Sequence, residues 1–267
     1  MTDHESDAQK NYLRQKKQEK YFISISRILL FLGFLFLWET SARLGWIDSF
    51  IFSSPGQIVN AFADMILHQS LLTHIGITLA ETLLSFLFVV LLGIGIAVLL
   101  WASPKLSSIL EPYLVVLNSL PKSALAPLLI VWLGANARTI VVAGMSVALF
   151  GFIINLYTGF REVDPEKLKL ISTLGGNKKD ELFKIVLPSS IPLILSNMKV
   201  NIGLCLVGVI IGEFIGAKQG LGYLIIYSSQ TFKLTWMLMA ICILCVIAMG
   251  LYGVLSFVEK RYLKKVL

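Results

Sequence analysis

The sequence predicts an all-α membrane protein with about six transmembrane helices and with both termini in the cytoplasm. Apolar residues make up 56% of the 267 positions and charged residues only 15%, about ten percentage points below the charged fraction of a typical soluble domain. Apolar runs of membrane-spanning length recur along the chain. The formal charge is +7, but the basic residues lie in separate clusters between these runs, which excludes a nucleic-acid partner.

Six segments are long enough to be spans, because a hydrocarbon core of about 30 Å requires roughly 20 apolar residues at about 1.5 Å each. The third of them contains Pro112, Pro121 and Pro127, which lack an amide donor and clash with the preceding turn, so we expect that span to be broken. The six segments are Phe22–Thr40, Gly76–Ala102, Leu106–Leu133, Thr139–Phe160, Pro188–Ala217 and Leu234–Val258.

The distribution of Lys and Arg predicts the orientation, because positive residues are retained on the cytoplasmic side. With the N-terminus inside, cytoplasmic segments hold 17 of the 23 basic residues, external connections hold five, and Lys199 lies within a span. Residues 1–20 then form a polar cytoplasmic tail, 21–260 a single transmembrane domain and 261–267 a short basic cytoplasmic tail. The predicted location is the cell membrane, in contact with lipid along every span.

The connection after the first span predicts an amphipathic helix on the external surface. Ser54 can cap it, Pro55 suits its first turn, and Ile58, Phe62 and Met65 recur at helical spacing. Such a helix either meets a partner or rests on lipid, and the pattern leaves both open.

The longest cytoplasmic connection, residues 161–187, predicts two short helices separated by glycines. Asp164 is a good helix cap before Pro165, and Gly175-Gly176 supply the left-handed backbone that ends a helix. Asn177 can cap a second helix that leads to Pro188, where the next span begins. The residues that we assign to this candidate coupling loop are Asp164, Leu168, Ile171, Leu174, Gly175, Gly176, Phe183, Leu187 and Pro188. They form either a rigid knob for a soluble partner or a helix pair lying on the membrane surface.

Polar residues inside the spans are candidates for a translocation pathway, since an ionisable group at a helix centre costs about 2.5–3.5 kcal/mol. Lys199 can also snorkel to the cytoplasm, Glu213 can reach interfacial water, and asparagines often join helices to one another. The candidates are Glu81, Asn118, Asn155, Lys199, Asn201 and Glu213.

Residues for enzymatic chemistry are scarce. The histidines, His4, His68 and His74, lie outside the span centres, and no H-E-x-x-H motif or carboxylate cluster is present, so neither a metal site nor acid–base catalysis is predicted. No G-x-x-x-x-G-K-[ST] phosphate loop is present either. We therefore expect no catalytic residues and no cofactor in this chain.

The cytoplasmic connection resembles the signature of permease subunits of binding-protein-dependent ABC importers, which reads E-A-A, three residues, G, nine residues, I-x-L-P. Gly175 matches the glycine, and Ile185-Val186-Leu187-Pro188 follow at the required spacing. Lys169-Leu170-Ile171 occupy the E-A-A positions, so an ion pair from a glutamate there to an ATPase is not expected.

Further motifs are similar to the branch of these permeases that imports sulfonates, taurine and nitrate. Ser85 departs from the branch, because it stands where these permeases commonly carry an arginine one turn after Glu81. The matching segments are Ser54-Pro55, the stretch from Leu120 to Leu128, Trp132-Leu133-Gly134, Gly212-Glu213 and Gly220-Leu221-Gly222.

The resemblance implies a methionine-importer-like fold and a dimer of permease subunits. It also implies two cytoplasmic ATPase subunits, which use ATP and Mg²⁺, and an extracytoplasmic solute-binding protein. It further implies inward transport by alternating access, of a small anionic solute that Lys199 would attract. The alternative is a stand-alone secondary transporter or channel, which would require an internal repeat or dense midplane charges, and the sequence has neither.

Overall fold

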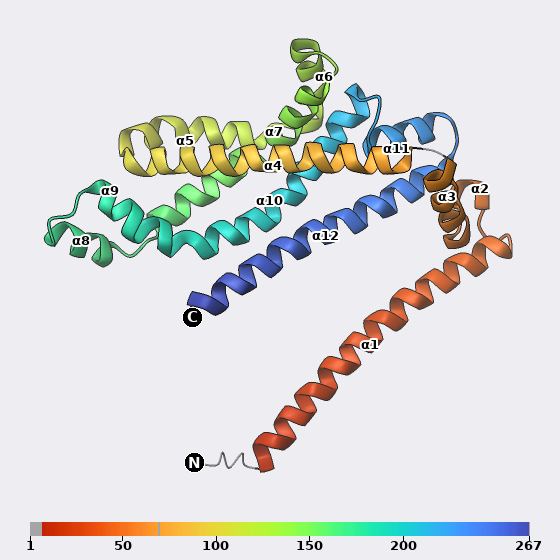
Figure 1. The fold of residues 1–267 in the computed structure, drawn as a ribbon, viewed down its shortest axis with the longest axis horizontal. Helices are drawn as coiled ribbons and strands as arrows, with labels where there is room; N and C mark the ends of the chain where they lie inside the picture. The colour runs from red at the N-terminus through yellow and green to blue at the C-terminus, as the bar shows by residue number, and fades with distance from the viewer. Residues whose placement is uncertain (1–6, 69, 267) are drawn as a thin grey trace.

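The computed structural model describes the backbone of residues 7–68 and 70–266 and the side chains of residues 12–67 and 70–264, and the described chain is helical without strands (Figure 1). Short turns connect the helices. In chain order, the elements are α1 (Asp7–Arg43), α2 (Ser49–Phe52), α3 (Pro55–His68), α4 (Leu71–Ala102), α5 (Pro104–Ser119), α6 (Lys122–Leu133), α7 (Ala137–Arg161), α8 (Pro165–Thr173), α9 (Lys178–Glu181), one turn of π-helix (Leu182–Val186), α10 (Leu187–Gly216), α11 (Leu221–Gln230) and α12 (Leu234–Val266).

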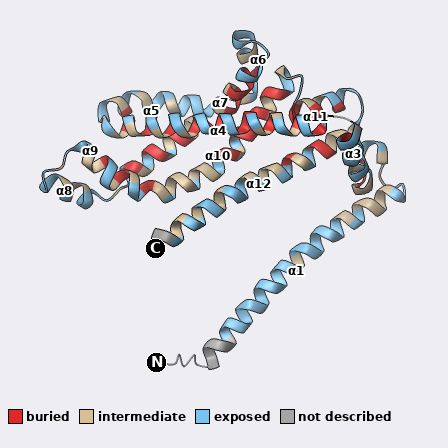
Figure 2. Ribbon diagram, viewed as in Figure 1, coloured by how far each residue is buried: buried red, intermediate tan, exposed pale blue. Residues whose placement is uncertain are grey.

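Helices α4, α7 and α10 form the centre of the bundle, and α7 packs against both of the others. Small residues permit this packing. A Cβ added at Gly208 of α10 would lie 2.8 Å from both the Ala143 carbonyl oxygen and the Gly144 Cα of α7. Close backbone approach of this kind is the usual basis of helix association in lipid, where no hydrophobic effect drives one helix onto another. Figure 2 shows the buried residues concentrated along these helices.

Two hydrophobic clusters stabilise the two ends of the bundle. At the cytoplasmic end, Phe152 and Phe160 of α7 pack with Val186 and Cys205, all at 0% exposure. At the external end, Met65 of α3 packs with residues of α4, α10, α11 and α12, including Leu221 and Met239. Each cluster joins helices that are distant in the sequence, so each fixes how the spans are arranged.

The predicted third span is broken as expected. Helix α5 ends at Ser119, α6 begins at Lys122, and the two are bent by 98° with Pro121 at the junction. Among the described residues, five single helices are long and apolar enough to span a membrane, or there are up to six spans if this bent pair counts as one. This confirms the prediction of about six spans in an all-α membrane protein.

Helix α1 diverges from the bundle (Figure 1), and its most apolar window has no buried residue. Near its C-terminal end, α1 contacts α3: Glu39 accepts a hydrogen bond of 2.9 Å from the backbone N–H of Gly56. The same carboxylate pairs with Arg43 at 2.6 Å. The helix begins at Asp7, so it includes polar residues that precede the apolar run.

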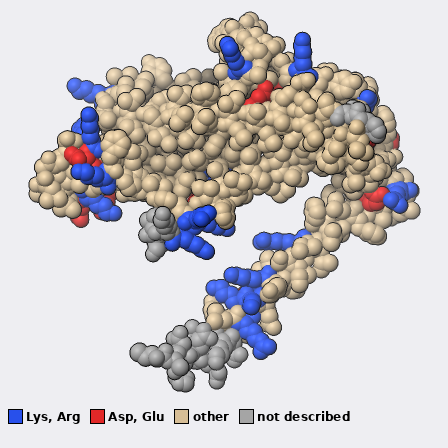
Figure 3. Space-filling model, in the orientation of Figure 1, with Lys and Arg blue, Asp and Glu red and all other residues tan. Residues whose placement is uncertain are grey.

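Basic side chains gather where the predicted topology places the cytoplasm. Figure 3 shows Lys and Arg around α8 and α9, near the C-terminus and along the first half of α1, with a broad uncharged surface between them and the external end. In Figure 1, the start of α1, the end of α12 and α8 lie toward one end of the long axis, whereas α3 and α11 lie toward the other. This arrangement agrees with cytoplasmic termini.

The amphipathic helix predicted after the first span is α3, with Ser54 at its start accepting from Gln57 N–H at 3.3 Å. From the sequence, this helix could either meet a partner or rest on lipid. In the structure, α3 packs against α12, and Met65 is only 2% exposed within the external cluster, while Val59 and Leu67 remain 64% and 75% exposed. The helix therefore packs on its own chain with one face and is uncovered on the other.

Candidate functional site

The cytoplasmic loop folds locally as the sequence predicts. Asp164 caps α8 by accepting a hydrogen bond of 2.9 Å from Glu166 N–H. Gly175 has φ = 81°, a left-handed conformation that glycine adopts readily, and Gly176 N–H donates to the Ile171 carbonyl at 2.9 Å to close the helix end. These contacts fix the end of α8 without any partner.

The second half of the loop is also capped. Asn177 and Asp180 form a reciprocal capping box at the start of α9. The chain then continues through the π-helical turn into α10 without a break, with Pro188 in the first turn of α10. Lys178 Nζ donates to the carbonyl of Ala102 at the end of α4, at 3.2 Å. The loop thus connects α7 to α10 and also contacts α4.

The apolar residues of this loop divide into two sets. Leu168 and Leu187 pack against the cytoplasmic core cluster, and Ile171 is half-buried. Leu170, Leu174 and Phe183 are instead 59%, 75% and 66% exposed. Leu170 lies on α8 and Leu174 ends it, whereas Phe183 lies in the π-helical turn. We call these three exposed apolar residues of the protruding loop the α8 patch.

At the external end, α4, α10 and α11 meet around two buried carboxyl groups, Glu81 at 5% and Glu213 at 1% exposure. Glu213 accepts hydrogen bonds from the Thr78 hydroxyl at 2.7 Å and from Gly222 N–H at 2.5 Å. Thr78 in turn accepts from Leu221 N–H at 2.8 Å. A side chain at Gly220, where φ is 113°, would overlap the Glu213 carboxyl group.

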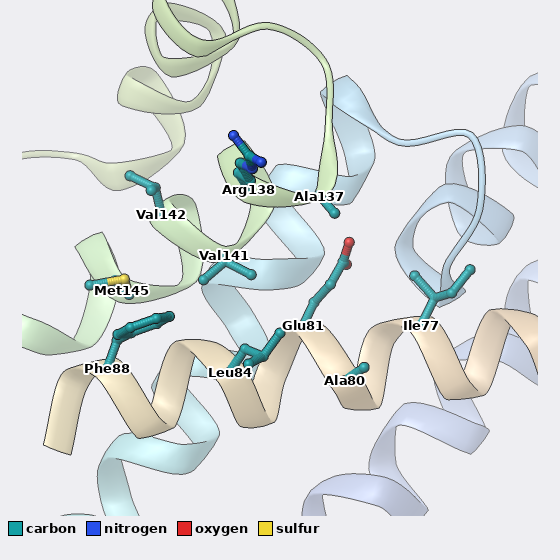
Figure 4. A pocket seen from close by; sticks show the side chains of 10 residues that line it. All are labelled: Ile77, Ala80, Glu81, Leu84, Phe88, Ala137, Arg138, Val141, Val142 and Met145. Atoms are coloured by element: carbon teal, nitrogen blue, oxygen red, sulfur yellow. The ribbon is translucent and has the colours of Figure 1, made fainter. Parts of the chain in front are cut away.

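Glu81 lines a cavity of about 550 Å³ between α4 and α7 (Figure 4). The walls of the cavity are apolar apart from Glu81 and Arg138. In Figure 4, the Glu81 carboxyl group extends toward Ala137 at the start of α7, and the Arg138 side chain points away from it. One turn further along α4, the buried Ser85 hydroxyl contacts the carbonyl oxygens of Glu81 and Val141, at 2.7 and 3.1 Å, and so links α4 to α7.

Lys199 is held in an ion pair with Glu259 of α12. Its Nζ lies 2.5 Å from Glu259 Oε2, and both side chains are only 14% exposed. The ammonium also lies 5.9 Å from the centre of the Tyr252 ring. Its charge is therefore already compensated within the chain.

Of the three asparagines predicted as pathway residues, Asn155 and Asn201 both bind Asn197. Asn155 of α7 donates to Asn197 of α10 at 3.1 Å, and Asn201 donates to the Asn197 carbonyl at 2.8 Å. Asn118 lies on α5 against α7, where a Cβ at Gly151 would come within 3.2 Å of its Oδ1. The Asn155 bond thus links α7 to α10, whereas the Asn201 bond lies within α10. Asn118 and Asn155 also stay exposed.

Comparison with known proteins identifies the family. The family described as "Binding-protein-dependent transport system inner membrane component" matches residues 89–264, which include the broken span, the cytoplasmic loop and both later spans. The chain belongs to this family. It is a permease subunit of the ABC importer type, located in the inner membrane.

Curated relatives support the same assignment. A Bacillus subtilis protein assigned as an aliphatic sulfonates transport permease is 26% identical over 94% of this permease and 91% of its own length. The formylaminopyrimidine transport permease protein of Halalkalibacterium halodurans is 29% identical over 77% of this permease and 81% of its own length. These two relatives are named for chemically different solutes.

The fold of this permease is similar to a solved structure of the MetNI methionine ABC transporter in an inward-facing conformation. The TM-score is 0.64 with 18% identical residues, and the match covers 74% of this permease and 96% of that chain. This confirms the methionine-importer-like fold expected from the cytoplasmic loop.

Several residues of these sites were missed in the sequence. Thr78 was not singled out, although His74, Thr78, Glu81 and Ser85 recur every three or four positions of α4 and so mark one polar face of an apolar helix. Leu170 was missed because the prediction followed apolar residues three positions apart, which are Leu168, Ile171 and Leu174. Asn197 and Glu259 lacked any sequence signal, since their partners lie on other helices.

Proposed function

We propose that this permease moves a small solute inward by alternating access, driven by separate cytoplasmic ATPase subunits that dock on the α8 patch. One observation supports this most: three exposed apolar side chains project from a capped loop that contacts α4 through Lys178 and continues without a break into α10. Such a rigid unit can transmit the closing of an ATPase pair to the spans, because packed helices move as bodies and do not deform continuously.

The proposed assembly is a pair of permease copies with two ATPase subunits and an external solute-binding protein. One chain offers one α8 patch, so two copies related by a two-fold axis would offer two equivalent patches to two ATPases. ATP and Mg²⁺ would be handled by the ATPases, and this chain would need no cofactor. The family match and the ABC permease relatives support these partners in general terms.

For the solute, we propose a small organic anion or zwitterion of the sulfonate and taurine class, as the sequence resemblance implies and the Bacillus subtilis relative supports. Lys199 does not offer a free charge for it, because Glu259 compensates that ammonium. Cations that line cavities at the external end include Arg138, Lys218 and Lys233. Glu81, Glu213, Asn118, Asn155 and Asn201 remain proposed pathway residues.

Substitution of Leu174 by Asp tests the docking surface. A charge in the centre of the α8 patch should remove most ATPase binding, since desolvating an unpaired carboxylate in an apolar contact costs several kcal/mol. The measurement is the amount of ATPase that co-purifies with the tagged permease from membranes.

The matched control is Leu67→Asp, because Leu67 is equally exposed at 75% but lies on α3 at the external end. We expect L67D to retain the ATPase and L174D to lose it, with both variants inserted at wild-type levels. Equal ATPase recovery with L174D and with the wild type would refute docking at α8.

A further inference from the structure

The outward ends of α4 and α10 hold two neighbouring carboxyl groups, Glu81 and Glu213. Glu81 follows Thr78 by one turn of α4, and the Thr78 hydroxyl donates to Glu213 at 2.7 Å. Both glutamates are at least nine-tenths buried, with exposures of 5% and 1%. A buried carboxylate is unfavourable unless it is paired or hydrogen-bonded. Two carboxylates that share a site cannot both remain ionised unless a cation joins them.

Glu213 is the fully satisfied member of the pair. Its two oxygens accept from Thr78 Oγ1 and from Gly222 N–H. Thr78 uses its own proton for this bond, because its oxygen accepts from Leu221 N–H. The surrounding donors therefore orient Glu213 as an acceptor, which a negatively charged carboxylate fulfils.

Glu81 is the incomplete member. Its Oε2 is buried and has no hydrogen-bond partner in the described part of the chain. The Ser85 hydroxyl is directed at the backbone carbonyl of Glu81 and not at its carboxyl group. An unpartnered oxygen on a side chain this deeply buried, next to a second carboxyl group, indicates a missing positive charge.

Cavities connect Glu81 with the external side. The cavity of about 550 Å³ contains Arg138 at the start of α7, and a second one, of about 470 Å³, contains Lys218 in the turn before α11. Glu81 lines both. A small ion can therefore reach the carboxyl pair from the external end of the bundle.

We propose that Glu81 and Glu213 together bind one exchangeable monovalent cation, a proton or an alkali ion, taken up from the external side. The ion completes the charge balance of a site built by α4 and α10 and closed by the Gly220–Gly222 turn. This site is separate from the α8 patch, and it stands whether or not the proposed solute is correct.

The other charged or titratable groups around the pair do not replace this ion. His74 of α4 uses Nδ1 to accept from Gly220 N–H at 2.9 Å. Arg138 of α7 points away from Glu81 in Figure 4, and within the described part of the chain no ion pair joins Arg138 or Lys218 to Glu81. Tyr223 of α11 stacks on His74, with ring centres 6.1 Å apart.

A bound cation should stabilise the contact between the outward ends of α4 and α10. Glu81 and Glu213 come from these two helices, which must separate if the permease opens on the external side. A cation that binds one conformation more tightly shifts the equilibrium toward it. The test therefore measures the midpoint of thermal unfolding of the purified permease, from about pH 5 to about pH 9, with N-methylglucamine, Na⁺ or K⁺ as the buffer cation.

We expect the wild-type midpoint to rise by about 3 °C or more when the site fills. A rise on acidification in N-methylglucamine identifies the proton, and a rise with Na⁺ or K⁺ at constant pH identifies an alkali ion. In Glu81→Gln this dependence should vanish, because the amide carries no charge to balance. The control Glu111→Gln, at an exposed position of α5, should keep the full wild-type dependence.

If E81Q fails to fold, the wild type supplies a second measurement. Dicyclohexylcarbodiimide modifies buried protonated carboxyl groups, and mass spectrometry of peptides locates the adduct. Labelling of Glu81 that declines with rising pH, or with added alkali ion, supports the site. Wild-type stability that depends on neither cation, an E81Q variant that keeps the dependence, or the lack of Glu81 labelling at every pH would overturn the proposal.

Discussion

At the residue scale, the polar groups inside the bundle are bound to one another across helices. Lys199 pairs with Glu259, Asn155 with Asn197, and Thr78 with Glu213. The sequence singled out one member of each pair, because an ionisable or amide side chain in an apolar run is conspicuous. It did not reveal the partners, since 60 or more residues separate Lys199 from Glu259 and Thr78 from Glu213.

Removing Lys199 should destabilise the permease more than removing the pair. Lys199→Met leaves Glu259 as an uncompensated, mostly buried charge, which should lower the free energy of unfolding by about 3 kcal/mol. Lys199→Met combined with Glu259→Gln should recover part of this loss. The measurement is a double-mutant cycle of thermal or denaturant unfolding in detergent. Additive effects of the two substitutions would show that the ion pair does not form.

At the element scale, local signals predicted the short helices better than they predicted the packing. The caps at Asp164 and Asn177 and the glycine ending of α8 follow from backbone chemistry within a few residues, and the structure confirms them. The prolines likewise predicted the break between α5 and α6. Helix α11, between two turns at the external end, was not predicted, because its ten residues are too few to span a membrane.

The orientation of α8 depends on Gly175, whose φ of 81° is unfavourable for other residues by about 1–2 kcal/mol. A Cβ there meets no atom within 4 Å, so Gly175→Val alters the backbone without a clash. We expect normal insertion, but ATP hydrolysis that no longer drives transport, measured as the ratio of uptake to hydrolysis in reconstituted vesicles.

Gly45→Val is the matched control for this substitution. Its φ is 73°, it also meets no atom within 4 Å, and it lies in the external turn after α1. Coupling should persist in G45V and decline in G175V. An equal decline in both variants would point to general backbone strain and against a specific role of α8.

At the scale of the whole molecule, the sequence predicted the membrane class, the number of spans and the position of the termini. These properties follow from composition, length and basic residues, which act independently of tertiary contacts. The divergence of α1 from the bundle was not predicted, because an apolar helix facing lipid and one facing protein have the same composition. The close packing of α4, α7 and α10 depends on which small residues face each other, and that is set by the fold.

The central claim is that a separate ATPase moves the spans through α8, and a label at the external end tests it directly. The native cysteines are replaced, Gln219→Cys carries a fluorophore beside Lys218, and ATP with Mg²⁺ is added to the reconstituted permease–ATPase complex. We predict a fluorescence change that requires both ATP and the ATPase and that is absent in L174D. A change that occurs without the ATPase or persists in L174D, or no change in the intact complex, would contradict the account.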